Sequence, residues 1–146
     1  MPSQPKKVLF LCTGNSCRSQ MAEAWVNALK SNEWQAFSAG IETHGMNPFA
    51  ISVMAESGVD MAGQYSKNVD ELKDNTFDLV VTVCDHAASH CPSLPSTLAV
   101  KHIPFDDPPA LAKHAKNEAE TLVSYRLVRD QIKTFVESSQ LSTAIS

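Results

Sequence analysis

Residues 6–19, KKVLFLCTGNSCRS, lead from a short apolar run into a polar loop that contains two cysteines and an arginine. The run over residues 8–11 has no polar side chain, which is typical of a strand buried on both faces of a parallel sheet. After the loop, apolar residues recur at helical spacing: Met21, Ala22, Trp25, Val26 and Leu29. The stretch therefore predicts a strand over 7–11 and a helix over about 19–30, with the loop between them.

A loop between the end of a strand and the start of a helix favours an anion. Successive backbone N–H groups point into such a loop, and the helix dipole adds partial positive charge. Arg18 supplies a fixed cation whose fork of donors suits a tetrahedral oxyanion. The same field favours the thiolate form of Cys12, which makes it a nucleophile aimed at the bound oxyanion.

The other loop residues are expected to bind the oxyanion with their amides and hydroxyls: Thr13, Gly14, Asn15, Ser16, Cys17 and Ser19. Gly14 permits tight curvature, and Ser19 is placed to hydrogen-bond the sulfur of Cys12. Cys17 is expected to be structural. The alternative is a cysteine that ends a buried strand and is followed by an ordinary turn.

Composition indicates one catalytic domain over residues 1–146, with a polar tail over 138–146 that is expected to be frayed. The net charge is −4 and no block of basic residues occurs, which argues against nucleic acid or an anionic membrane surface as a partner. The N-terminal stretch fits neither a signal peptide nor a membrane span, so we expect a cytoplasmic protein. In that compartment, cysteines are more often catalytic, redox-active or metal-binding than structural disulfides.

Strand and helix patterns alternate along the rest of the chain. Further strands are expected over 34–40, 77–83 and 98–103, and a short helix at most within 64–74. A second helix is expected between an N-cap at Asn47 and a C-terminal Gly58, with Ile51, Met54 and Ala55 on its apolar face. A long amphipathic helix is expected over 118–136. The pattern predicts an α/β fold with a doubly wound, four-stranded parallel sheet flanked by helices.

Three chemically active segments follow strands of this predicted sheet. Cys12 follows the first strand, Cys84 the third, and Asp106 and Asp107 the fourth. In open parallel sheets, ligands bind beyond the carboxyl ends of the strands. We therefore expect these segments to meet at one edge of the sheet.

The loop from Cys12 to Ser19 resembles the phosphate-binding loop of the low-molecular-weight protein tyrosine phosphatases and of the arsenate reductases built on that fold. The turn at Asp107-Pro108 is similar to theirs as well, and the resemblance covers nearly the whole chain. It implies that Cys12 is the nucleophile, that Arg18 holds the oxyanion and that Asp107 is the general acid. Without the resemblance, Asp106 and Asp107 could both be solvated turn residues.

Residues 84–92, CDHAASHCP, resemble the redox segment of the thioredoxin-coupled arsenate reductases, which the phosphatases lack. The resemblance implies that Cys12 attacks arsenate and that Cys84 then forms a disulfide with Cys12 as arsenite leaves. Cys91 next attacks Cys84, and thioredoxin reduces the final disulfide between Cys84 and Cys91. Phosphate or sulfate would compete with arsenate.

Other interpretations of the second cysteine pair remain open. Cys84 and Cys91 could be small buried apolar residues, or zinc ligands together with His86 and His90. The spacing of these four residues does not fit the usual paired zinc ligands, so we predict no metal and no cofactor. The protein could also be a low-molecular-weight phosphatase, or an oxyanion-binding domain whose cysteines only report oxidation.

One position departs from the pattern of the resembled reductases. In some of them, a potassium ion near the loop is held partly by an acidic residue in the segment after the second helix, where this chain has Lys67. The lysine ammonium could replace the cation, so no potassium requirement is expected. Asn15, Glu23 and Ser38 are the polar neighbours expected to brace the loop.

Overall fold

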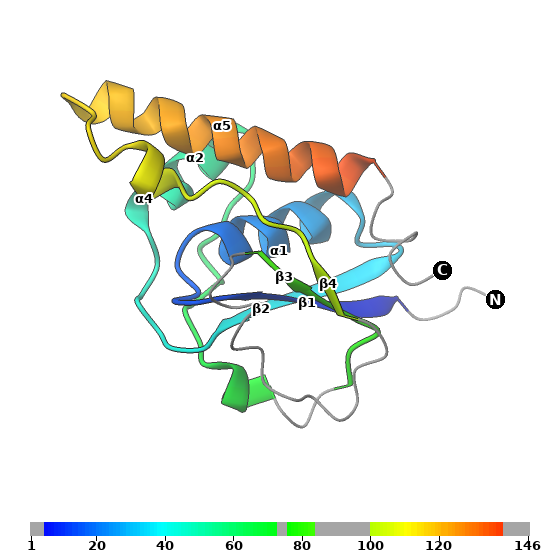
Figure 1. The fold of residues 1–146 in the computed structure, drawn as a ribbon. Helices are drawn as coiled ribbons and strands as arrows, with labels where there is room; N and C mark the ends of the chain where they lie inside the picture. The colour runs from blue at the N-terminus through cyan, green and yellow to red at the C-terminus, as the bar shows by residue number, and fades with distance from the viewer. Residues whose placement is uncertain (1–4, 73–75, 84–99, 139–146) are drawn as a thin grey trace.

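The computed structural model describes residues 5–72, 76–83 and 100–138, which form a parallel sheet with helices packed on it (Figure 1). The strands are β1 (Lys6–Cys12), β2 (Trp34–Gly40), β3 (Leu79–Thr82) and β4 (Val100–His102). Their order is β2-β1-β3-β4, and each of the three pairings is parallel. The α/β fold predicted from the sequence, a four-stranded parallel sheet with flanking helices, is therefore confirmed.

The helices cover mainly one side of this sheet in Figure 1, while the short turn η1 lies on the other side. The helical elements are α1 (Arg18–Leu29), α2 (Pro48–Glu56), η1 (Val69–Leu72), α4 (Pro108–Leu111) and α5 (Glu118–Glu137). Trp25 of α1 donates from Nε1 to the carbonyl oxygen of Arg129 on α5, at 3.1 Å. None of the helices in the described ranges is long and apolar enough to cross a membrane.

β1 lies at the centre of the sheet because its side chains are apolar on both faces. It pairs with β2 along one edge and with β3 along the other, and residues 8–11 are fully buried. Fully burying such a side chain contributes about 1.5–3 kcal/mol. The strand thus anchors the loop that follows it at its carboxyl end.

The second helix begins as predicted but presents a different face to the core. The Asn47 side chain accepts hydrogen bonds from the first-turn N–H groups of Phe49 and Ala50, and Gly58 after the helix has φ of +80°. The predicted inward face is wrong at Ile51, which is 37% exposed, and at Ala55, which is also exposed. Because α2 is apolar almost all round, its pattern does not select one face; the buried residues are Ala50, Val53 and Met54.

Two further predictions need correction. Leu29, at the last position of α1, is 41% exposed rather than buried. At the turn expected at Asp107-Pro108, residues 108–111 form a helical turn, α4, which was not predicted; proline suits the first helical position, where no N–H is needed. The predicted strand over 98–103 is described only from Val100, and the tail over 138–146 only at Ser138.

Candidate active site

The loop between β1 and α1 is held by the segment that follows β2. The backbone N–H groups of Ile41, Glu42 and His44 donate to the carbonyl oxygens of Cys12, Thr13 and Gly14, at 3.2, 2.9 and 2.9 Å. These bonds extend the pairing of β1 and β2 beyond the strands themselves. The loop therefore has a defined course before any ligand arrives.

Asn15 turns the loop through a left-handed backbone conformation, with φ of +51°. The residue is fully buried, and its Nδ2 donates to Ser19 Oγ at 2.9 Å. Its Oδ1 accepts from Gln20 Nε2 at 2.8 Å and from the backbone N–H of Lys67 at 2.9 Å. Asparagine tolerates this conformation better than most residues, and the hydrogen bonds offset its cost.

Ser19 is fully buried beneath the loop, where its hydroxyl accepts the bond from Asn15. An accepting hydroxyl still carries a hydrogen that it can donate. The predicted donation from Ser19 to the sulfur of Cys12 stays a prediction.

A second glycine, outside the loop, permits the close approach of these two segments. A Cβ at Gly40 would lie 2.8 Å from the carbonyl oxygen of Thr13 and would also collide with that of Glu42. Both obstacles are backbone atoms, which cannot move aside without displacing the loop. Gly40 therefore positions the loop between β1 and α1 although it carries no functional group.

A pocket of about 300 Å³ lies over the loop. It is lined by Cys12, Thr13, Gly14, Ser16, Cys17, Arg18, His44, Asp107 and Pro109. The structure thus brings the predicted nucleophile, cation and acid together, although Asp107 is far from the loop in sequence. Asn15 and Ser19 are buried behind the lining and support it.

Arg18 connects the loop to two other parts of the sheet edge. Its Nη1 donates to the carbonyl oxygens of Phe105 at 3.0 Å and Val83 at 3.4 Å. Its Nη2 lies 3.6 Å from Asp107 Oδ1, and its side chain is only 14% exposed. The guanidinium is therefore fixed in place at the pocket, as an oxyanion-binding group requires.

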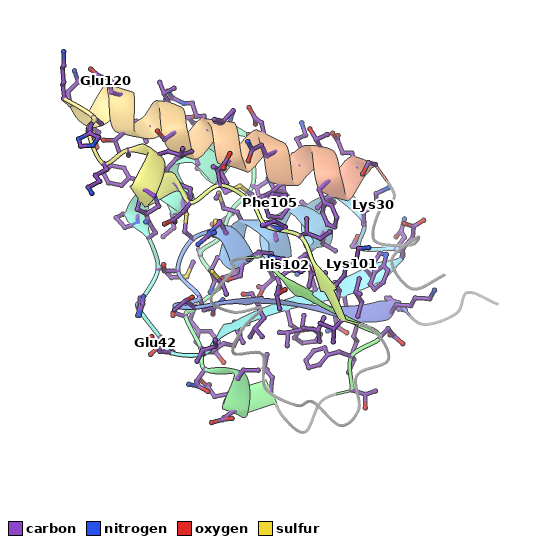
Figure 2. The ribbon with its side chains drawn as sticks, in the orientation of Figure 1. Lys30, Glu42, Lys101, His102, Phe105 and Glu120 are labelled. Atoms are coloured by element: carbon purple, nitrogen blue, oxygen red, sulfur yellow. The ribbon has the colours of Figure 1, made fainter. Side chains whose placement is uncertain are left out.

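The two adjacent aspartates occupy different environments. Asp107 lines the pocket, whereas Asp106 accepts a hydrogen bond from Gln131 Nε2 of α5 at 3.1 Å and is exposed. Phe105, between β4 and α5 in Figure 2, packs edge-on against Phe135 with the ring centroids 5.8 Å apart. This packing holds the segment so that Asp107 points toward Arg18.

Cys12 and Cys17 are both buried, but the surroundings of Cys17 are those of a structural residue. Burial raises the pKa of the Cys17 thiol to about 12, although Arg18 acts in the opposite direction. Cys17 is thus protonated at neutral pH, and a protonated thiol is a poor nucleophile. Its expected structural role is consistent with this environment.

A buried ion pair lies behind the loop. Lys67 Nζ is 3.8 Å from Glu23 Oε1, and the two side chains are 8% and 12% exposed. Ser38 Oγ donates to the same Glu23 oxygen at 2.8 Å. Burial raises the pKa of Glu23, while Lys67 and Ser38 lower it. The ammonium also donates to the carbonyl oxygen of Tyr65 at 3.1 Å and lies 4.6 Å from the centroid of that ring.

Two residues contribute to the site in ways that the sequence did not indicate: Asn47, expected only as a helix cap, and His44. Asn47 donates from its backbone N–H to the Ser16 carbonyl oxygen at 3.0 Å and from Nδ2 to the Tyr125 hydroxyl of α5 at 3.0 Å. His44 lines the pocket, and its Nε2 lies 3.2 Å from Glu42 Oε2. Figure 2 shows Glu42 beyond the end of the sheet where β1 enters the loop. No periodicity in the sequence predicts these contacts of Asn47 and His44, because they depend on how distant segments pack.

Cys84 and Cys91, together with His86 and His90, lie outside the described residues. The predicted relay and the zinc alternative both stay predictions. Within the described ranges, no group of three or more histidine, cysteine or acidic side chains could hold a metal ion.

The comparisons with known proteins agree with this geometry. The low molecular weight phosphotyrosine protein phosphatase family matches residues 7–138. An arsenate reductase of Halalkalibacterium halodurans is 47% identical over 139 residues, which is 92% of this chain and 98% of the relative. The arsenate reductase of Bacillus subtilis is 45% identical, with the same coverage.

A solved structure described as an arsenate reductase in the phosphate binding state has a TM-score of 0.76 and 32% identity, and covers 97% of this chain and 99% of its own. An arginine phosphatase from Geobacillus stearothermophilus shares the fold, with a TM-score of 0.70. The family match extends from the second residue of β1 to just past the end of α5 and includes the loop, Arg18 and Asp107. The chain therefore belongs to the low molecular weight phosphotyrosine protein phosphatase family, and curated relatives along its length are arsenate reductases.

Proposed function

We propose that this protein reduces arsenate to arsenite by a relay of Cys12, Cys84 and Cys91, and that thioredoxin reduces the final disulfide. The observation that carries the proposal is the pocket of about 300 Å³ shared by Cys12, Arg18 and Asp107. It occurs in a chain with arsenate reductases among its relatives. We further propose a single catalytic domain that works in the cytoplasm, where thiols are kept reduced.

In the first step, the Cys12 thiolate attacks the arsenic atom of bound arsenate, so that a sulfur–arsenic bond forms as an arsenic–oxygen bond breaks. Asp107 protonates the departing oxygen, which leaves as water. Arg18 and the loop amides stabilise the charge on the remaining oxygens. Cys17 takes no part, because burial keeps its thiol protonated.

In the second step, the Cys84 thiolate attacks the sulfur of Cys12. A disulfide forms, and the electron pair of the sulfur–arsenic bond passes to arsenic, which leaves as arsenite. The Cys91 thiolate then attacks Cys84, and Cys12 departs as a thiolate ready for the next arsenate. Two electrons from thioredoxin finally reduce the disulfide between Cys84 and Cys91.

Lys67 is proposed to supply the positive charge behind the loop, so that turnover needs no potassium ion. The pairing of its Nζ with Glu23, at 3.8 Å, supports this proposal. Turnover should be equal in potassium and sodium chloride at the same ionic strength. A marked stimulation by potassium would contradict it.

The test is steady-state reduction of arsenate with thioredoxin as reductant, in a series of cysteine-to-serine variants. Cys12→Ser should abolish reduction, and Cys84→Ser and Cys91→Ser should abolish multiple turnover. Cys17→Ser is the matched control in the same loop and should keep activity, because its thiol is not a nucleophile. Full multiple turnover by Cys84→Ser or Cys91→Ser would contradict the relay.

A phosphatase activity is the second candidate, and the family match and the shared Cys12, Arg18 and Asp107 pocket favour it. Hydrolysis of p-nitrophenyl phosphate should be weak and should not depend on Cys84 or Cys91. If this hydrolysis is efficient and arsenate reduction is absent, the protein is a phosphatase.

A further inference from the structure

We propose that His44, supported by Glu42, is a second cationic contact for the oxyanion beside Arg18, so that oxyanion affinity rises when His44 is protonated. The inference rests on the proposed oxyanion site and adds a specificity-determining residue to it. Its basis is the position of His44 in the lining of the pocket that also contains Cys12 and Arg18.

The backbone places His44 against the loop. Its N–H donates to the carbonyl oxygen of Gly14 at 2.9 Å, within the ladder that joins the segment after β2 to the loop. A Cβ at Gly14 would overlap the His44 ring, with Nδ1 as the nearest atom. Because Gly14 has no side chain, the imidazole can lie directly on the loop.

One ring nitrogen of His44, Nε2, has a defined partner. Nε2 lies 3.2 Å from Glu42 Oε2, so the carboxylate can accept its hydrogen. In the neutral ring with hydrogen on Nε2, Nδ1 is only an acceptor, and it cannot donate to an oxyanion oxygen. A second proton makes Nδ1 a donor and gives the ring a positive charge that Glu42 stabilises.

Several charged or titratable groups lie around the pocket that His44 lines. Glu42 lies on its own segment, Cys12 and Arg18 come from the loop and the start of α1, and Asp107 precedes α4. A positively charged ring at this position would be attracted by the carboxylates of Glu42 and Asp107 and repelled by the guanidinium of Arg18. A bound dianion adds further negative charge and should favour protonation more strongly.

Sulfate is the probe, because its charge does not change over the range in which histidine titrates, between about pH 5 and 8. Binding is measured by calorimetry across that range in a Cys12→Ser background, which removes the reactive thiol from the pocket. The Cys12→Ser protein is compared with three double variants that also carry His44→Gln, Glu42→Gln or His114→Gln. His114 is exposed, lies after α4 and serves as the control. Arg18→Ala reports whether sulfate occupies this pocket.

His44→Gln should weaken sulfate binding about fivefold at the acid end, since the side chain is 51% exposed and its charge is partly screened. The loss should vanish at the alkaline end. Glu42→Gln should move the pH of this change downward, and His114→Gln should have no effect. Thermal melting checks that each variant is folded.

A reciprocal measurement separates a contact from a structural role. Sulfate should raise the midpoint of the His44 proton titration followed by NMR, because binding and protonation are linked. If sulfate binding has the same pH profile in the Cys12→Ser protein and in the Cys12→Ser/His44→Gln protein, this inference is overturned and the oxyanion site stays intact. If Arg18→Ala binds sulfate as tightly as the parent protein, or if the parent protein does not bind sulfate at all, both the oxyanion site and this inference are overturned.

Discussion

Lys67→Met tests the buried ion pair behind the nucleophile loop. Methionine keeps the apolar stem of the lysine but removes the ammonium that lies 3.8 Å from Glu23 Oε1. Glu23 would keep the hydrogen bond from Ser38 but lose its cation. The variant therefore leaves a buried carboxylate without a positive partner.

The magnitude follows from the distance and the burial. Coulomb's law with an effective dielectric constant of about 20 gives about 4 kcal/mol for unit charges at 3.8 Å. Removing one partner of a buried pair typically costs about 3–5 kcal/mol. Because both side chains keep a little exposure and methionine fills the space, we expect unfolding free energy to fall by about 3 kcal/mol.

The loss should depend on pH in a defined direction. Burial raises the pKa of Glu23, and Lys67 opposes that rise, so Lys67→Met should raise this pKa further. A carboxyl group whose folded pKa exceeds its unfolded value contributes stability at low pH, and this contribution is lost as pH rises through the folded pKa. The difference between wild type and Lys67→Met should therefore be greatest at neutral pH and shrink on acidification.

The assay is urea unfolding at a series of pH values, followed by circular dichroism. The double variant Lys67→Met/Glu23→Gln should recover part of the loss and remove its pH dependence. Lys113→Met, at an exposed lysine after α4, is the matched control and should change stability little. A loss below about 0.5 kcal/mol for Lys67→Met at every pH would refute the buried pair.

Three further predictions address other parts of the chain. Asp107→Asn should slow formation of the first arsenic adduct in rapid-quench experiments more than Asp106→Asn, because only Asp107 lines the pocket; the reverse order would assign the acid to Asp106. Gly40→Ala should lower the melting temperature and weaken sulfate binding, because its Cβ meets the backbone of Thr13; unchanged values would contradict this packing. Glu56→Gln should flatten the loss of stability on acidification: Arg126 lowers the pKa of Glu56 to about 2, so its contribution is present at neutral pH and is lost toward that value. If the unfolding free energy of Glu56→Gln falls on acidification as steeply as that of the wild type, the ion pair between Glu56 and Arg126 is contradicted.

The parts of the fold that follow from local pattern were predictable. β2 has the predicted limits, Trp34–Gly40, because alternation ends at a glycine, and Asn47 with Pro48 marks the start of α2. The face of α2 was not predictable, because the helix is apolar almost all round and only its packing against α5 selects the buried side. A pattern predicts orientation only where polar residues oppose apolar ones.

The candidate site was likewise predictable only in part. Parallel strand order sufficed to bring Cys12 and Asp107 to one edge, and the loop motif identified Arg18. The contact of His44 with the loop was not predictable, because it depends on the backbone ladder beyond β2 and on the space left by Gly14. Cys84 and Cys91 lie outside the described residues, so their roles rest on the resemblance.

The proposal to be tested is that Cys84 and Cys91 supply the two electrons that reduce arsenate in the pocket. Its most direct test is disulfide mapping by mass spectrometry after one turnover of the reduced protein with arsenate, without thioredoxin. We expect arsenite release and a disulfide between Cys84 and Cys91, with Cys12 returned to the thiol form. A final disulfide between Cys12 and Cys17 would contradict it.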